Sequence, residues 1–328
     1  MSRARSLLRG SPLGRVAVLA VALAIANTVI APALLTGPRL TGLVTLFVPL
    51  LLAAMAGVPA ILSGGGGLDL SVGPLLGFVN VLAVAVLVPH GLGSAWYGIP
   101  LCLLLGAAVG AVNGVLVAYV RLQPIVATLG SYLVLAGLSL VVLPQPRGGA
   151  PAWAATLGAG SFGGHVPNVL LLPAAALLVW WTACRTGLVR LIRAVGSDQR
   201  AAYTAGVDVG LVRIGAYTLG GLLAALAGMA LTALIDSGDP GVGKQYTLIA
   251  VAAVALGGNS LAGGTGGITG PALGAATLFL IQLLLSALHM SSLWIQVVYG
   301  AVLLAAICLN SRAPNGLRAH AVTARQGA

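Results

Sequence analysis

The chain contains no glutamate, a single lysine and only three cysteines, and charged residues make up 6% of its 328 positions. Soluble domains carry about 25% charged residues, so a soluble fold would expose more apolar surface than water tolerates. Cys102, Cys184 and Cys308 are far apart and form no CxxC pair, which argues against a disulfide framework or a cysteine metal site. General acid–base chemistry would depend on five aspartates, so we expect no enzyme, metal or cofactor.

Long apolar runs take the place of the missing charges. Hydrophobic residues make up 59% of the chain, and its mean hydropathy is +1.06. A bilayer core needs about 20 apolar residues in helical form to cross it, and runs such as residues 16–35 reach that length. A spanning β-barrel would alternate apolar and polar residues instead. The sequence therefore predicts an all-α, polytopic membrane protein with about ten transmembrane helices in a single domain, residues 1–328.

Basic residues predict the orientation of these helices. The predicted spans are residues 14–36, 42–62, 74–90, 96–120, 124–143, 169–183, 212–234, 247–257, 269–288 and 292–310. The eighth is too short to cross alone, so we expect it to begin near Gln245. With both termini cytoplasmic, only Arg39, Arg147 and Lys244 of the 16 basic residues lie outside, in keeping with the positive-inside rule. This predicts a multi-pass protein of the cell membrane, although the first span also fits a cleaved secretory signal.

The net charge of +11 has the same explanation. The basic residues flank the predicted spans and build no basic face with interleaved aromatic residues, so we expect contact with lipid headgroups and no nucleic acid.

Two glycine-rich loops, residues 63–74 and 257–271, each end in Gly-Pro and re-enter an apolar segment. Their Gly-Pro pairs lie 197 residues apart, which predicts an internal duplication of residues 14–120 as residues 212–310. Both loops fall on the cytoplasmic side, so the repeats would be parallel, with broken or re-entrant helices of the kind found in transporters. Neither loop has the GxxxxGK[ST] pattern of a phosphate-binding loop, so close helix packing is the simpler interpretation.

Asp69 is the only carboxylate near a predicted span. An ionisable group at such a position is a functional candidate by default. The structural alternative is that Asp69 or Ser71 caps the helix that begins near Pro74, or locks the loop before it. We favour the cap or lock and keep direct contact with the substrate open.

The predicted cytoplasmic segment 184–213 is long and rich in arginine. Asp198 is placed to cap a short helix at residues 199–205, which Gly206 would close. Such a helix must pack against something, either lipid headgroups or a cytoplasmic partner protein. Small Ala201 and Ala202 would fit a groove of that partner, and Tyr203 would anchor it.

Four motifs resemble the permease subunits of ATP-binding cassette (ABC) importers for sugars, the ribose-type branch. They are GGLDLSVG at residues 66–73, NGVLV at 113–117 with PIVATLG at 124–130, RAVGSDQRAAYTAG at 193–206, and GGNSLAGGTG at 257–266. The resemblance implies a permease dimer, two cytoplasmic ATPase subunits and an extracytoplasmic binding protein. It implies a substrate path or its frame at Asp69, Ser71, Asn113, Thr128 and Asn259, and an ATPase-coupling segment with Arg193, Gly196, Asp198, Ala201, Ala202, Tyr203 and Gly206.

Three alternatives remain open at this stage. The first is a permease for branched-chain amino acids or another small polar solute; the branched-chain relatives share the alanine-rich loop, although the DLSVG and ATLG segments favour a sugar or polyol. An ion-coupled secondary transporter would use membrane-embedded carboxylates, which are nearly absent. A membrane enzyme would need a catalytic constellation, and the chain offers none. The motifs also depart from the family at Asp198 and at Gln199-Arg200, where Asn and an acidic pair are common, which leaves the identity of the ATPase open.

Overall fold

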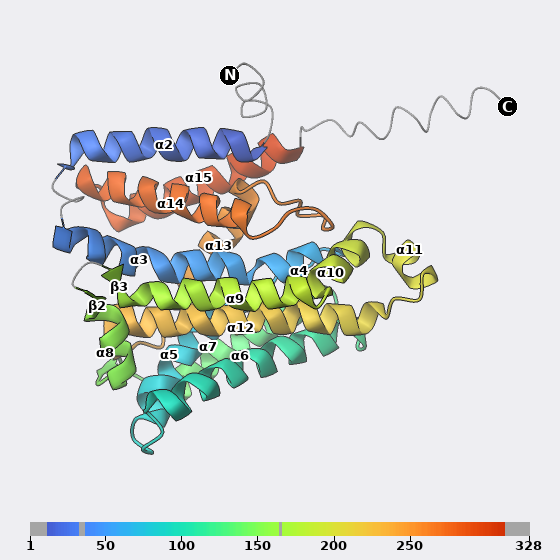
Figure 1. Ribbon diagram of the computed structural model, residues 1–328, viewed down its shortest axis with the longest axis horizontal. Coiled ribbons are helices and arrows are strands. Elements are labelled where there is room, and N and C mark those ends of the chain that lie inside the picture. The colour runs from blue at the N-terminus through green and yellow to red at the C-terminus, as the bar shows by residue number, and fades with distance from the viewer. Residues whose placement is uncertain (1–11, 33–36, 164–165, 312–328) are drawn as a thin grey trace.

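The computed structural model describes residues 12–32, 37–163 and 166–311. Long helices lie side by side along the longest axis of the molecule (Figure 1). The first half contains α2 (Pro12–Ile30), α3 (Gly37–Ala56), α4 (Val58–Leu62), α5 (Val72–Val81) with the π-helical η2 (Leu82–Leu87), α6 (Ala95–Ala118), α7 (Pro124–Val142) and α8 (Ala152–Ala159). The second half contains η3 (Asn168–Leu170), α9 (Leu171–Arg185), α10 (Leu188–Ser197), α11 (Gln199–Thr204), α12 (Val209–Ile235), α13 (Lys244–Leu256), α14 (Thr269–Ala287) and α15 (Ser292–Ser311).

In the part of the chain that the structure describes, four two-residue strands interrupt the predicted all-helical pattern. Strand β1 (Arg147–Gly148) pairs antiparallel with β4 (Ser237–Gly238), and β2 (Ser161–Phe162) pairs antiparallel with β3 (Val166–Pro167). These pairs tie together the connections between helices at the end of the bundle opposite α11. They do not change the fold class, which is helical.

Among the described residues, seven helical segments are long and apolar enough to cross a membrane. Three further apolar helices, at Val72–Leu87, Lys244–Leu256 and Leu293–Val302, are shorter and correspond to the third, eighth and tenth predicted spans. Helix α13 begins at Lys244, close to the expected Gln245, but its 13 residues extend only about 20 Å. This is about two-thirds of a hydrocarbon core of roughly 30 Å, so α13 does not cross such a core by itself.

Helix α12 is the centre of the bundle. It packs against α3, α5, α6, α8, α9 and α10, and 78% of its most apolar stretch is buried, against 17% for α2. Glycines allow α6 and α12 to approach closely, since a Cβ added to Gly110 would lie 2.9 Å from the Cα of Thr218. Small residues at a crossing are the usual means of helix association in lipid, where apolar burial between helices gives little driving force.

Helix breaks in the first half follow from local sequence. Gly57 separates α3 from α4, and Pro59 occupies the first turn of α4, where its missing N–H group is least harmful. Helix α5 begins at Val72, two residues before the expected start at Pro74. The glycine-rich residues between Leu62 and Val72 therefore form an irregular connection between α4 and α5, as predicted for a broken helix.

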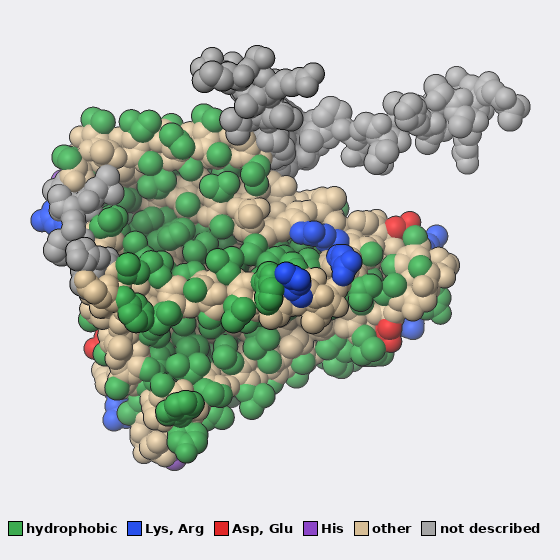
Figure 2. All heavy atoms as spheres, in the orientation of Figure 1, with side chains coloured by type: hydrophobic (Ala, Val, Ile, Leu, Met, Phe, Trp, Pro, Cys, Tyr) green, Lys and Arg blue, Asp and Glu red, His purple; other side chains and the backbone are tan. Residues whose placement is uncertain are grey.

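Charged and apolar side chains are separated on the surface. Apolar side chains cover the sides of the bundle, while basic side chains gather near α10 and α11 and a few others lie at the opposite end (Figure 2). The start of α3, next to Arg39, lies at the opposite end (Figure 1). The start of α2 and the end of α15 point toward the α11 end (Figure 1), while the chain termini themselves lie outside the described residues.

Three pairs of helices begin at equal spacing along the chain. Helices α2 and α12, α5 and α14, and α6 and α15 each start 197 residues apart, the same interval that separates the two Gly-Pro pairs. The contacts are reciprocal in part, because α2 packs on α14 and α12 packs on α5. The two glycine-rich loops lie at the same end of the bundle, where the amide of Gly264 donates to the carbonyl of Leu62 at 3.1 Å.

Candidate translocation and coupling sites

Four of the predicted polar residues meet in one buried cluster between α5, α6 and α7. The Oδ1 atom of Asp69 accepts hydrogen bonds from the Ser71 amide at 2.9 Å and the Ser71 hydroxyl at 2.6 Å. The Asn113 amide group donates to the Ser71 hydroxyl at 2.9 Å, and the hydroxyl of Ser131 donates to Asn113. The Thr128 hydroxyl lies 2.8 Å from the carbonyl of Pro124 in its own helix and 3.2 Å from the carbonyl of Leu68 in the same loop. One chain of hydrogen bonds thus joins the loop before α5 to α6 and α7, and Thr128 adds a contact from α7 to that loop.

Asp69 locks the loop before α5. The N-cap of α5 is Ser71, and its side chain makes no cap hydrogen bond, so the prediction that Asp69 or Ser71 caps this helix by its side chain is wrong in that form. Because Asp69 binds both polar groups of Ser71, it fixes a turn one residue ahead of the helix instead. Burial raises the pKa of the Asp69 carboxyl, while the hydrogen bonds from Ser71 lower it.

Asn259 lies in the other glycine-rich loop and does not join this cluster. Its side-chain amide donates to the carbonyl of Gly267 at 3.0 Å, and its Oδ1 atom accepts from the Gly267 amide at 3.3 Å. These two bonds close residues 259–267 into a compact loop. The structure thus gives Asn259 a loop-closing contact and separates it from the four clustered residues.

Tyr217 adds an unexpected polar atom to the core next to the cluster. Its side chain is fully buried on α12 and packs with Ala60, Val117 and Ala127. The Tyr217 hydroxyl has no hydrogen-bond partner among the described residues. The sequence did not single out this residue, because a tyrosine within an apolar run is normally interpreted as part of the hydrophobic core.

At the α11 end, the predicted capped helix is confirmed. Asp198 is the N-cap of α11, and its carboxylate accepts from the amides of Arg200 at 2.9 Å and Ala201 at 3.0 Å. Gly206 follows the helix with a φ of +83°, the left-handed conformation that glycine adopts at helix ends. Gln199, the first residue of α11, accepts a hydrogen bond of 2.9 Å from Arg213 of α12. Helix α11 is therefore a short, capped element that is tied to the central helix.

The exposed and buried faces of α11 differ from the sequence expectation in one respect. Tyr203 is 72% exposed, as an anchor for a partner requires, and Arg200 and Ala201 are exposed beside it. Ala202 is only 7% exposed because it packs against its own chain. The prediction that Ala202 enters a groove of a partner protein is therefore wrong, and Ala201 with Tyr203 forms the accessible face.

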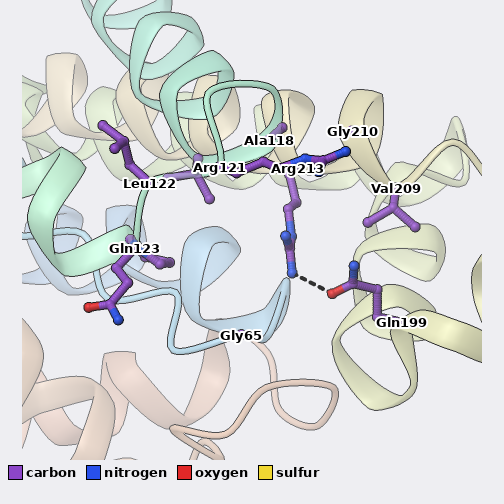
Figure 3. Close-up of a pocket in the computed structure, with 11 residues that line it drawn as sticks. Gly65, Ala118, Arg121, Leu122, Gln123, Gln199, Val209, Gly210 and Arg213 are labelled. Atoms are coloured by element: carbon purple, nitrogen blue, oxygen red, sulfur yellow. Dashed lines mark hydrogen bonds between the residues drawn. The ribbon is translucent and has the colours of Figure 1, made fainter.

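Next to α11 lies an open cavity of about 420 Å³. It lies between the first glycine-rich loop, the α6–α7 connection, α11 and the first turns of α12. Arg213 extends across it and donates to Gln199 (Figure 3). Its lining consists of Gly65, Val117, Ala118, Arg121, Leu122, Gln123, Pro124, Gln199, Val209, Gly210 and Arg213. The cavity shares Val117 with the packing around Tyr217, so a thin apolar layer separates it from the buried interior.

The remaining predicted coupling residues lie on α10. Arg193 is partly buried, with its Nε atom lacking a partner among the described residues. Gly196, in the last turn of α10, lies directly against residues of both glycine-rich loops. In the part of the chain that the structure describes, no group of three or more metal-ligating side chains is found.

An apolar helical bundle with a buried polar chain and a projecting, capped helix at its basic end defines a membrane permease. The family model described as "Branched-chain amino acid transport system / permease component" matches residues 39–307. The chain belongs to this permease family.

Similarity to curated proteins indicates which members of this family the chain resembles. The chain is 36% identical over 255 residues to the ribose import permease protein RbsC of Escherichia coli (strain K12), which covers 75% of this chain and 78% of the relative. It is 34% identical to the protein of the same name from Bacillus subtilis (strain 168), over 75% and 77% of the two chains. It is 31% identical to the fructose import permease protein FrcC of Rhizobium meliloti, over 74% and 70%. No solved structure matches the chain significantly. The resemblance to ribose-type permeases is thereby confirmed.

Proposed function

We propose that this protein is the membrane-spanning permease subunit of an ABC importer that translocates a sugar or polyol. In this proposal it pairs with a second permease subunit, identical or related, and receives its substrate from an extracytoplasmic binding protein. Two cytoplasmic ATPase subunits supply the energy. The observation that carries the proposal is α11, a capped helix whose Tyr203 side chain is 72% exposed.

The choice of a sugar over a branched-chain amino acid rests on the relatives. The family description names branched-chain amino acids, whereas the relatives at 31–36% identity named above are permeases for ribose and fructose. Uptake of radiolabelled ribose, allose, fructose and leucine, measured in cells with and without the gene, tests this choice. Uptake of leucine alone would reject the sugar assignment.

We also propose ten spans with both termini in the cytoplasm, built from two parallel repeats. The equal 197-residue spacing of three helix starts supports the duplication, and the reciprocal packing of α2 on α14 and α12 on α5 agrees with it. The basic end of the bundle, with α11, is the cytoplasmic side in this arrangement because of the positive-inside rule.

The docking of α11 on the ATPase is tested at its exposed face. Ala201→Arg and Tyr203→Ala change side chains that contribute little to the fold of the permease, so both variants should insert normally. We expect the ATPase subunit to be lost from the purified complex and ATP-driven uptake to fall to background, because interface anchors carry much of the binding energy.

Ala155→Arg on α8 is the matched control. It introduces the same side chain at an exposed position, but at the opposite end of the bundle. It should retain the ATPase. If Ala201→Arg and Tyr203→Ala both co-purify with the ATPase and transport at the wild-type rate, α11 is not the coupling helix. Uptake that continues without any ATPase and collapses with the ion gradient would favour a secondary transporter.

A further inference from the structure

Three chain segments meet backbone to backbone at Gly196. They are the end of α4 with Gly64, the last turn of α10, and residues 263–264 of the second glycine-rich loop. A Cβ added to Gly64 would lie 2.8 Å from the Cα of Gly196, and a Cβ added to Gly196 would lie 2.7 Å from the amide nitrogen of Gly264. Real Cβ atoms do not approach other atoms so closely, so the contact depends on glycine. We call these three segments the glycine junction.

A direct hydrogen bond reinforces the junction. The amide of Gly264 donates to the carbonyl of Leu62 at 3.1 Å, which joins the two glycine-rich loops. Ser197, the last residue of α10, lies against Gly264, since a Cβ added to Gly264 would be 2.7 Å from the Cα of Ser197. The last turn of α10 therefore contacts both loops at the point where they are bonded to one another.

Two arginines contact the same loops on either side of α11. A Cβ added to Gly267 would lie 3.2 Å from Nη2 of Arg193, and one added to Gly65 would lie 2.9 Å from Nη2 of Arg213. Arg193 precedes α11 and Arg213 follows it, and Arg213 also binds Gln199 at the start of α11. The segment that carries α11 is thus attached to the second loop, to the junction and to the first loop.

Both loops lead directly into helices of the bundle. The first continues into α5 at Val72 and the second into α14 at Thr269. Backbone atoms in contact have no rotamers through which a displacement can be absorbed, and packed interiors transmit strain. A shift of α10 would therefore move both loops together, and with them the starts of α5 and α14.

We propose that Gly196 is a positioning residue that makes the end of α10 and both glycine-rich loops move as one body when the ATPase displaces α11. This proposal rests on the proposed function, because it assigns the route by which movement of the coupling helix reaches the membrane segments. Gly196 touches neither substrate nor nucleotide in this scheme. It acts through Gly64 and Gly264.

The test uses Gly196→Ala in the complex of permease and ATPase, reconstituted in lipid. Hydrogen exchange of residues 63–71 and 257–268 is compared in ADP and in ATP with vanadate. In the wild type we expect exchange to change in both loops together. In Gly196→Ala the added Cβ separates the segments, so we expect the nucleotide-dependent difference to fall by about tenfold or more, and sugar uptake with it. Co-purification of the ATPase with the variant is measured in parallel.

Gly130→Ala and Gly137→Ala on α7 are the controls, because an added Cβ meets nothing within 4 Å at either position. Both should respond to nucleotide as the wild type does. If Gly196→Ala fails to insert, Ser197→Leu crowds Gly264 from an exposed position and makes the same prediction. A wild-type nucleotide response in a correctly folded Gly196→Ala, or in Ser197→Leu, overturns the proposal. So does loss of the ATPase from the variant complex, which would place Gly196 in the docking face. If the wild type itself binds no ATPase, the proposed function fails instead.

Discussion

The carboxylate of Asp69 gives the sharpest test of the buried polar cluster. Asp69→Ala removes the acceptor for two donors, the amide and the hydroxyl of Ser71, and Ser71 is completely buried. A buried group without a partner costs about 1–3 kcal/mol. The Ser71 hydroxyl can rotate and still accept from Asn113, whereas its amide cannot, so we expect a loss of about 2–4 kcal/mol in unfolding free energy. For a chain of this size that corresponds to roughly 3–6 °C in melting temperature.

Asp69→Asn distinguishes the hydrogen-bonding role of Asp69 from any role of its negative charge. It keeps an acceptor for Ser71 but introduces a buried N–H donor, so we expect a loss of only about 1–2 kcal/mol and transport near the wild-type rate. The assay is thermal unfolding of the purified permease in detergent, with uptake measured in parallel. Asp236→Asn, at an exposed position in the left-handed conformation that asparagine tolerates, is the control.

Two results would refute this reasoning. If Asp69→Ala unfolds at the wild-type temperature, the hydrogen bonds to Ser71 do not hold the loop. If Asp69→Asn folds well but transports nothing, the negative charge itself takes part in transport and the locking role is incomplete.

Three further predictions concern orientation, helix packing and α11. In a cysteine-free background, Gly148→Cys and Gly241→Cys should react with an impermeant thiol reagent from outside, and Ala205→Cys only from inside. Position 241 is used because the neighbouring Pro240 is buried. Labelling of position 148 from the cytoplasm would contradict the proposed topology. Gly110→Val should disrupt the α6–α12 contact, costing about 1–3 kcal/mol or more, whereas Gly137→Val should be close to neutral in a comparison of melting temperatures. Gln199→Ala removes the acceptor for Arg213 at an exposed site, so we expect a loss below about 1 kcal/mol but faster hydrogen exchange in α11; unchanged exchange would show that α11 does not depend on Arg213.

Much of the fold could be predicted because a membrane chain has few choices. Apolar runs of spanning length and the capping pair Asp198 and Gly206 are local signals, and they located most helices and α11 within a few residues. The interruption at Gly57, inside the second predicted span, was harder to foresee. It depends on packing against neighbouring helices, which an apolar sequence hardly encodes.

The site was only partly foreseeable for the same reason. Motif membership identified Asp69, Ser71, Asn113 and Thr128, but not that the first three form one hydrogen-bonded chain or that Thr128 contacts the same loop, because their helices are brought together by tertiary packing. Ser131 lies three residues beyond Thr128 and could have been found from helical spacing. The inward position of Ala202 could not, since alanines at 201 and 202 look alike in sequence and only one of them faces the protein.

Helix α11 and the packed bundle differ in how many substitutions they tolerate, because α11 has few buried side chains. Ala202 is the one buried residue of that helix, so changes at its exposed positions leave the bundle intact. The glycine junction and the α6–α12 crossing have no such freedom, because even a methyl group would collide there. Under the proposed coupling role of α11, a lineage could exchange the partner ATPase by altering a few surface side chains while the membrane segments stay unchanged. An engineer testing that role with a different ATPase would begin at Arg200, Ala201 and Tyr203.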